Sequence, residues 1–297
     1  MKKESHVAIV DTHAHIFQRG LPLASVRRYA PDYDALLVDY LGMLDAHGIA
    51  RGVLVQPSFL GIDNSYLLAG LAAAPARLRG IAVVAPDVDA GELVRLDAAG
   101  VVGLRLNLVG GAALPDLRSP PWRALLRSAV DLGWHVEVHR EARDLPLLLA
   151  PLLEAGVNVV VDHFGRPDPA KGVDDSGFRA LLEAGASRRV WVKLSAVYRN
   201  GANGVGERIA RDAMPLLRRA FGPERLLWGS DWPHTRFEDD TSVAASLALL
   251  ETLLPDAAAR RIVLNDAPNA LYRFVDAGQS DDGASGDDHA APAATKA

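Results

Sequence analysis

The sequence contains no cysteine, and this absence limits the chemistry that its sites can use. A chain without thiols forms no disulfide, binds no metal through thiolates and has no cysteine nucleophile. Any metal would therefore be held by histidine, aspartate or glutamate.

Lysine is scarce, and the basic residues form no stripe along the sequence. Five of the 32 basic residues are lysines and the rest are arginines, and the net charge is −5. A nucleic-acid partner would require a basic patch that is missing here. The apolar run before Asp11 is too short for a signal peptide or a membrane span. We therefore expect a cytoplasmic protein with neither nucleic acid nor a membrane as partner; whether it forms a homo-oligomer stays open.

The composition is that of a globular protein with one large core. Of the 297 residues, 49% are apolar and 23% are charged, close to the average for folded domains. An α/β barrel commonly uses about 250 residues as one domain. Residues 277–297 are rich in Ala, Asp, Gly and Ser and show no apolar periodicity, so we expect a disordered tail there. Residues 1–276 are predicted to form a single catalytic domain.

Eight short apolar runs alternate with longer helical patterns. Near-continuous apolar runs are typical of parallel strands that are covered on both faces. The predicted strands lie at 7–11, 52–56, 80–85, 103–107, 135–139, 157–162, 190–194 and 226–230. Apolar spacing of three and four predicts helices between and after them. These helices include 35–47, 121–133, 145–155, 178–187, 206–221, 243–254 and 257–263.

This alternation fits two folds, a (β/α)8 TIM barrel and a doubly wound open sheet. Eight is the strand number of the barrel, and no glycine-rich dinucleotide fingerprint follows the first strand. Polar residues also gather at the carboxyl ends of the predicted strands, where barrel enzymes carry their active sites. The sequence therefore favours the α/β fold class with a TIM barrel.

The first predicted strand is followed by a pair of histidines, His13 and His15. Because side chains alternate along an extended chain, the two imidazoles point the same way. Such a pair can bind a divalent metal or polarise a carbonyl group, and it can also be purely structural.

Three other strand ends add polar groups at the same rim. His139 ends the fifth strand, His163 follows the sixth and Asp231 follows the eighth. With the first histidine pair they form a set of nitrogen and oxygen ligands suited to zinc or manganese, with a carboxylate to manage a proton. Convergence of four strand ends favours a catalytic site over scattered structural residues. The alternative role of Asp231 is a helix N-cap.

Several motifs resemble the amidohydrolase-2 group of lactonases in the amidohydrolase superfamily. They lie at 11–15, 56–58, 63–64, 103–105, 162–166 and 228–234. The resemblance extends over about residues 7–274 and implies the amidohydrolase type of TIM barrel. It also implies that His13, His15, His163 and Asp231 are catalytic.

The chemistry implied by the resemblance is ester hydrolysis. Asp231 takes a proton from water, hydroxide adds to the lactone carbonyl, and imidazoles or a metal stabilise the oxyanion. Asp231 then protonates the leaving oxygen.

The resemblance further implies a substrate-binding set of Ser58, Arg105, Arg166 and Arg199. Arg105 lies in the fourth predicted strand and the others lie past strand ends. Guanidinium groups make paired, charge-assisted contacts with carboxylates, so this set predicts a small anionic lactone as substrate. The alternative for each arginine is a loop salt bridge.

His139 departs from the pattern of the group's metal-free members, which act on pyrone dicarboxylates and lack a histidine there. Metal-using relatives carry one. His13, His15, His139 and Asp231 could therefore hold one zinc or manganese, while a metal-independent reaction stays the alternative. The fourth strand ends without a lysine, which disfavours a binuclear site bridged by a carboxylated lysine.

Three functions follow from these observations. The leading one is hydrolysis of a carboxylate-bearing lactone, such as a pyrone, a muconolactone or a sugar-acid lactone. The second is metal-dependent decarboxylation, and the third is a barrel that only binds a carboxylate. Asp231 argues against the third, because an unpaired carboxylate beside an anionic ligand is repelled.

Overall fold

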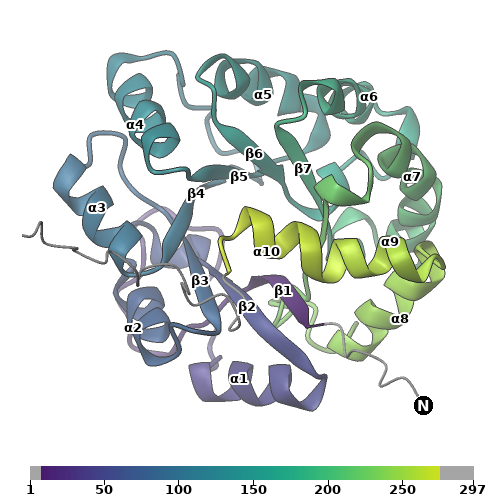
Figure 1. The fold of residues 1–297 in the computed structure, drawn as a ribbon, viewed down its shortest axis with the longest axis horizontal. Coiled ribbons are helices and arrows are strands. Elements are labelled where there is room, and N and C mark those ends of the chain that lie inside the picture. The colour runs from purple at the N-terminus through teal and green to yellow at the C-terminus, as the bar shows by residue number, and fades with distance from the viewer. Residues whose placement is uncertain (1–7, 275–297) are drawn as a thin grey trace, which may run out of the picture.

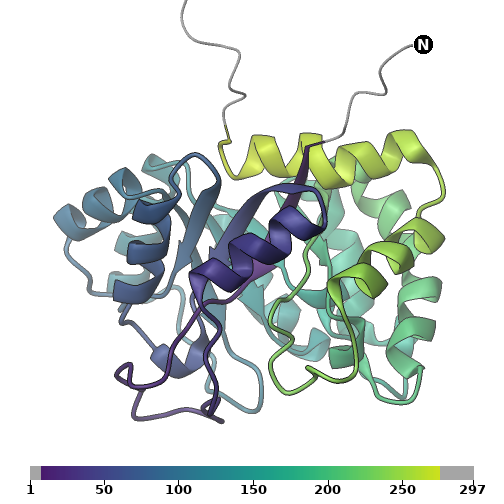
Figure 2. The same cartoon turned by 90° about the horizontal axis from the view of Figure 1, so that it is seen from below.

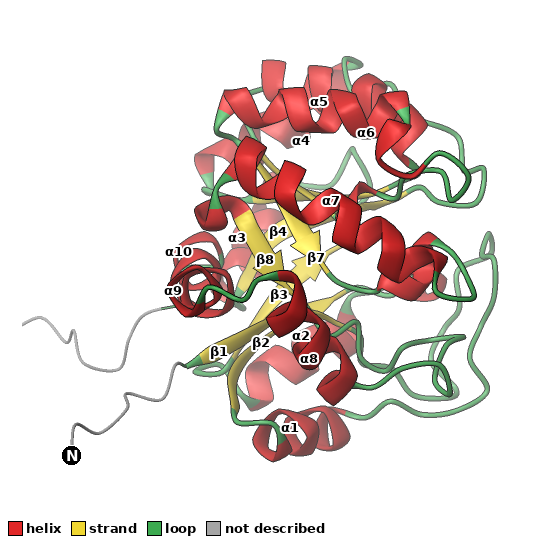
Figure 3. Cartoon of the chain, turned by 90° about the vertical axis from the view of Figure 1, so that its right-hand side faces the viewer, coloured by secondary structure: helices red, strands yellow, loops and turns green. Residues whose placement is uncertain are grey.

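The computed structural model describes residues 8–274, and the tail predicted at 277–297 lies outside them. Eight parallel strands follow one another in the order β1 to β8 in a single sheet. Figure 1 labels β1 to β7, and Figure 3 labels β8. A doubly wound sheet would reverse its strand order at a switch point. The sequential order confirms the predicted (β/α)8 barrel.

The strands agree with the sequence prediction to within a few residues. They are β1 Ile9–Ala14, β2 Ile49–Val55, β3 Leu78–Ala82, β4 Val101–Asn107, β5 His135–His139, β6 Asn158–Val161, β7 Val190–Leu194 and β8 Leu226–Trp228. β5 and β7 have the predicted bounds. β1 and β3 differ most, each by two residues at the start and three at the end. β1 ends later than predicted because Ala14 still pairs with Leu54 of β2 and the strand continues into the histidine motif.

Helices surround the strands on the outside of the barrel (Figure 3). They are α1 Leu37–Ala46, α2 Ser65–Ala73, α3 Ala90–Ala98, α4 Pro120–Asp131, α5 Leu145–Glu154, α6 Ser176–Ala184, α7 Val205–Phe221, α8 Val243–Leu253, α9 Ala257–Arg261 and α10 Ala267–Leu271. Figure 2 shows α9 and α10 lying across the end of the barrel where β1 begins, with long loops at the opposite end. Within residues 8–274, none of the helices combines the length and the apolar character that a membrane span requires.

The seam between β1 and β8 is held by a buried carboxylate. Asp11 accepts hydrogen bonds from the backbone N–H and the hydroxyl of Ser230, at 2.8 and 2.6 Å. It also accepts from the hydroxyl of Tyr40 in α1, at 3.1 Å. Just beyond, the N–H of Asp231 donates to the carbonyl oxygen of His13, at 2.8 Å. The seam therefore fixes the histidine motif directly against the chain that follows β8.

The barrel interior has an apolar and an ionic layer. At the end covered by α9 and α10, the side chains of Val10, Val53 and Ile81 pack with Tyr272 and Phe274. Each such buried aliphatic side chain contributes about 1.5–3 kcal/mol to folding. Nearer the carboxyl ends of the strands, the interior holds charged and polar side chains with almost no exposure. They include His13, Arg105, Glu137, Asp162 and Lys193.

Gly177 tests how closely α6 packs against the chain that follows β5. A Cβ atom there would lie 1.9 Å from the carbonyl oxygen of Ala142, whereas a Cβ at Gly42 in α1 would meet nothing within 4 Å. We expect Gly177→Ala to lower the free energy of unfolding by about 1–3 kcal/mol, because backbone must move. Gly42→Ala, the matched control, should raise it by up to about 1 kcal/mol. Urea unfolding followed by circular dichroism measures both; equal stability of the two variants would contradict the packing described.

Candidate active site

A pocket of about 320 Å³ opens at the carboxyl ends of the strands. Of the residues predicted from sequence, seven line it: His15, Ser58, Arg105, His139, His163, Arg199 and Asp231. His13 lies beneath them and is wholly buried. Arg166 is partly buried and is not part of this lining. The structure thus brings most of the predicted set to one place.

The two histidines of β1 face the carboxylate that follows β8. His13 Nε2 lies 3.6 Å and His15 Nε2 lies 3.8 Å from Oδ1 of Asp231. His15 Nδ1 is 2.7 Å from the carbonyl oxygen of Val55. Because a carbonyl only accepts, Nδ1 of His15 carries the proton and its Nε2 keeps a lone pair.

Asp231 is held in place by hydrogen bonds to Oδ2. That oxygen accepts from Tyr198 at 2.5 Å and from Arg199 Nε at 2.8 Å. Oδ1 has no hydrogen-bond partner among residues 8–274. Burial would raise the pKa of Asp231, but the charge of Arg199, with His163 and other neighbours, lowers it below its usual value. Asp231 is therefore a carboxylate at neutral pH with one oxygen free.

The surrounding imidazoles are neutral. Burial is the main cause that lowers the pKa of His15 to about 3, and it lowers those of His13, His139 and His163 well below their usual value. Neutral imidazoles can accept or donate a hydrogen bond, depending on which nitrogen carries the proton.

His139 and His163 form the other wall of the site. Their ring centroids are 4.7 Å apart with the planes nearly perpendicular. His163 follows β6 with a positive φ of 53°, and its Nδ1 lies 2.8 Å from the hydroxyl of Ser195. Neither nitrogen of His139 has a hydrogen-bond partner in the described part of the chain. His139 is thus available to a ligand or to water.

Two groups of side chains bring possible metal ligands within 4.8 Å of one another. One is His13, His15 and Asp231, and the other is His13, Asp162 and His163. His139 belongs to neither group in residues 8–274. Of the four ligands that the sequence suggested for a metal, three are therefore adjacent and the fourth stands apart.

The arginines play different parts in the structure. Arg105 is buried, donates to the carbonyl oxygen of Gln56 at 2.9 Å and has Nη2 3.6 Å from Asp162. Arg199 lines the pocket, but its Nε is bonded to Asp231. In Arg166, burial, followed by repulsion from Arg199, lowers the pKa. Arg105 is thus the predicted arginine that combines burial with a place in the pocket wall.

Some residues at the pocket could not be predicted from the sequence. Arg28 and Tyr29 reach the pocket from the loop between β1 and α1, which has no periodicity or motif. Tyr198, which holds Asp231, stands beside a predicted arginine. Lys193 and Glu137 lie beneath the site, and they are visible in the sequence as charges inside apolar strands.

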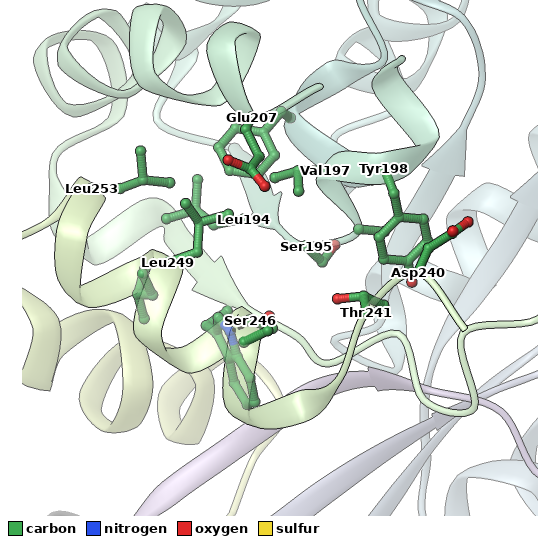
Figure 4. A pocket seen from close by; sticks show the side chains of 15 residues that line it. Leu194, Ser195, Val197, Tyr198, Glu207, Asp240, Thr241, Ser246, Leu249 and Leu253 are labelled. Atoms are coloured by element: carbon green, nitrogen blue, oxygen red, sulfur yellow. Dashed lines mark hydrogen bonds between the residues drawn. The ribbon is translucent and has the colours of Figure 1, made fainter. Parts of the chain in front are cut away.

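A larger cavity, of about 580 Å³, lies next to the site between α7, α8 and the chain after β7. Figure 4 shows Leu194, Leu249 and Leu253 on one side of it and Tyr198 and Thr241 on the other. It contains none of the predicted catalytic residues. Its walls touch the active site through the hydroxyls of Ser195 and Tyr198. The larger volume of this cavity does not identify it as the active site, because the ionisable groups converge in the smaller pocket.

Comparisons with known proteins agree with this geometry. Residues 10–274 match the amidohydrolase family. The chain is 36% identical over 277 residues to a 2-pyrone-4,6-dicarbaxylate hydrolase of Comamonas testosteroni, covering 89% of both chains. It is 30% identical over 272 residues to a 4-sulfomuconolactone hydrolase of Hydrogenophaga intermedia, covering 89% of this chain and 88% of that one.

A solved structure is also similar. It is a probable 2-pyrone-4,6-dicarboxylic acid hydrolase from Acinetobacter baumannii with citric acid bound, and it shares 39% identity and a TM-score of 0.87. The comparison covers 90% of this chain and 100% of that one. From the fold, the convergent histidines and aspartate, and these matches, the chain belongs to the amidohydrolase family.

Proposed function

We propose that this barrel hydrolyses the ester bond of a small lactone that bears carboxylates, such as a pyrone dicarboxylate, a muconolactone or a sugar-acid lactone. The observation that carries the proposal is the free Oδ1 of Asp231, an ionised carboxylate oxygen 3.6 and 3.8 Å from two neutral imidazoles. Addition of water to a carbonyl requires a general base and a hydrogen-bond donor for the oxyanion. The lone pair of His15 Nε2 cannot donate, so the donor is the N–H of another imidazole of the site. The relatives named above are lactone hydrolases, which supports the ester class.

In the proposed reaction Asp231 accepts a proton from water as the oxygen attacks the lactone carbonyl. The oxyanion receives hydrogen bonds from imidazole N–H groups of the site. The tetrahedral intermediate collapses, the ring C–O bond breaks, and the proton held by Asp231 passes to the leaving oxygen. The products are the two ends of one opened chain, a new carboxylate and a hydroxyl or its keto tautomer.

The residues do not fit a resident zinc or manganese ion, although three possible ligands are adjacent. Oδ2 of Asp231 is already bonded to a guanidinium and a phenol. The ammonium of Lys193 lies 2.9 Å from Nδ1 of His13, so a second positive charge adjoins the ligand group. Positive side chains on two of three ligands oppose a dication. We therefore favour the metal-independent alternative, in which imidazoles alone stabilise the oxyanion.

The charge of the pocket supports an anionic substrate. Arg28 and Arg105 line it together with Arg199. In Arg28, burial is the main cause that lowers the pKa, with repulsion from Arg199 and Arg105. Cations that repel one another gain most from a ligand that carries negative charge between them. A carboxylate on the lactone supplies it.

The direct test is turnover of 2-pyrone-4,6-dicarboxylate, a muconolactone and a sugar-acid lactone. Ring opening is followed by loss of pyrone absorbance and by chromatography of the products, with carbon dioxide measured in parallel. We expect ring opening with no release of carbon dioxide. Release of carbon dioxide would favour the decarboxylase alternative, and binding without turnover would favour the binding barrel.

Asp231→Asn tests the proposed base. The amide keeps the shape of the side chain and removes the proton acceptor, so kcat should fall about 10²–10⁴-fold while KM changes little. Asp239→Asn, an exposed carboxylate on the same loop, is the matched control and should leave kcat unchanged. Retained turnover in the Asp231 variant would rule out the mechanism.

Arg105→Met tests the substrate's charge. Loss of a charge-assisted contact of about 1.5–3 kcal/mol should raise KM for a dicarboxylate roughly 10- to 150-fold. Arg143→Met, at an exposed arginine outside the pocket lining, should leave KM unchanged. Thermal unfolding of both variants checks that the fold is intact. If the two variants have the same effect, Arg105 has no special part in binding.

A further inference from the structure

A lysine is buried at the centre of the barrel, directly beneath the proposed catalytic residues. Lys193, on β7, has no exposed surface. Its Nζ lies 2.6 Å from Oε1 of Glu137 on β5, 2.9 Å from Nδ1 of His13 and 3.7 Å from Oδ1 of Asp162. Burying a lysine costs free energy unless it is paired. The reaction proposed above gives this costly group no role.

The nearest group to the amine of Lys193 is the carboxylate of Glu137. Burial alone would raise the pKa of Glu137, but the charge of Lys193, with contacts from His135, lowers it to about 2. The hydroxyl of Tyr272 donates to the same carboxylate oxygen, at 3.2 Å. A carboxylate at 2.6 Å therefore faces the lysine amine. An ammonium has three N–H donors and no acceptor.

This donor determines where the proton of His13 lies. Because Nζ donates to Nδ1, that nitrogen must accept, and the neutral ring carries its proton on Nε2. Nε2 points toward Asp231 and has no hydrogen-bond partner among the described residues. His15 is the opposite case, since its Nδ1 donates to Val55. The two histidines of one motif thus present an N–H and a lone pair, respectively, to the same space.

We propose that Lys193 is a positioning residue that holds His13 as an Nε2–H donor toward the reacting carbonyl and thereby disfavours metal binding at the histidine pair. A metal ligand needs the Nε2 lone pair, and its other nitrogen then donates to a carboxylate or a carbonyl. Here the Lys193 amine lies 2.9 Å from Nδ1 of His13, closer than the nearest carboxylate oxygen, Oδ1 of Asp162, at 3.5 Å. The part concerning the carbonyl rests on the proposed lactone hydrolysis; the part concerning the metal does not.

The test replaces the buried ion pair without leaving one charge alone. Lys193→Met combined with Glu137→Gln removes both charges, and Lys171→Met, at an exposed lysine, is the control. Zinc affinity is measured by titration calorimetry of the purified full chain. Groups that contact a ligating histidine change metal affinity about 10- to 100-fold, so the double variant should bind zinc tighter by that factor. The Lys171→Met variant should bind it as weakly as the unmodified protein.

The proton on His13 is observed directly by long-range ¹H–¹⁵N NMR of the imidazoles, with His13→Asn to assign the signal. We expect Nε2–H in the unmodified protein and a shift toward Nδ1–H in the double variant. A purely structural role of Lys193 would leave this signature unchanged. Nδ1–H on His13 of the unmodified protein would overturn the proposal.

Kinetics give the third readout. Loss of one oxyanion donor typically lowers kcat about 10²–10³-fold, so the double variant should lose kcat with little change in KM. Unchanged kcat together with unchanged zinc affinity would also overturn the proposal. If the unmodified protein opens no lactone at all, the proposed function fails, while the NMR and zinc measurements still decide the role of Lys193.

Discussion

Closure of the barrel between β1 and β8 is the constraint on which the site depends. At this seam the Asp11 carboxylate of β1 accepts hydrogen bonds from Ser230, which follows β8, and from Tyr40 in α1. Burial outweighs those hydrogen bonds and raises the pKa of Asp11 to about 6. The group is therefore costly to bury as an anion, and its hydrogen bonds offset part of that cost. What the seam achieves is proximity: it places the β1 histidines against Asp231, which is 216 residues or more away along the sequence.

The ionic layer beneath the pocket sets the electrostatics of everything above it. Lys193 and Arg105 face Glu137 and Asp162 in space from which water is excluded. Charges in such surroundings interact strongly and cannot reorganise as water would. Burial, followed by the charge of Lys193, lowers the pKa of His13, whereas Arg199, outside this layer, favours the carboxylate form of Asp231.

The fold was predictable from the alternation of short apolar runs with longer helical patterns. β5 and β7 have the predicted bounds although each carries a charged residue, Glu137 or Lys193, among its apolar ones, whereas β1 extends into its polar motif because those side chains are buried by the site they form. Convergence of His15, His163 and Asp231 also followed from strand-end positions.

The partners of the site residues were not predictable in the same way. Pairing of Arg199 with Asp231 depends on two loops that only the folded barrel brings together. Arg28 reaches the pocket from a loop without periodicity, so no pattern distinguishes it from other surface arginines. Lys193 is conspicuous in an apolar strand, but its contact with His13 joins residues 180 positions apart.

The Tyr40 hydroxyl connects the outer layer of helices with the site. It donates from α1 to Asp11 in the barrel, and it lies so close to Gly52 that a Cβ added there would be 2.2 Å from the hydroxyl oxygen. One helix of the outer ring is thus two hydrogen bonds from the histidine motif. Sequence drift in such an outer helix is ordinarily tolerated as long as an apolar face remains. Here a side chain larger than that of glycine at position 52 would collide with the Tyr40 hydroxyl, so a strand of the barrel and a helix of its exterior constrain each other's sequence.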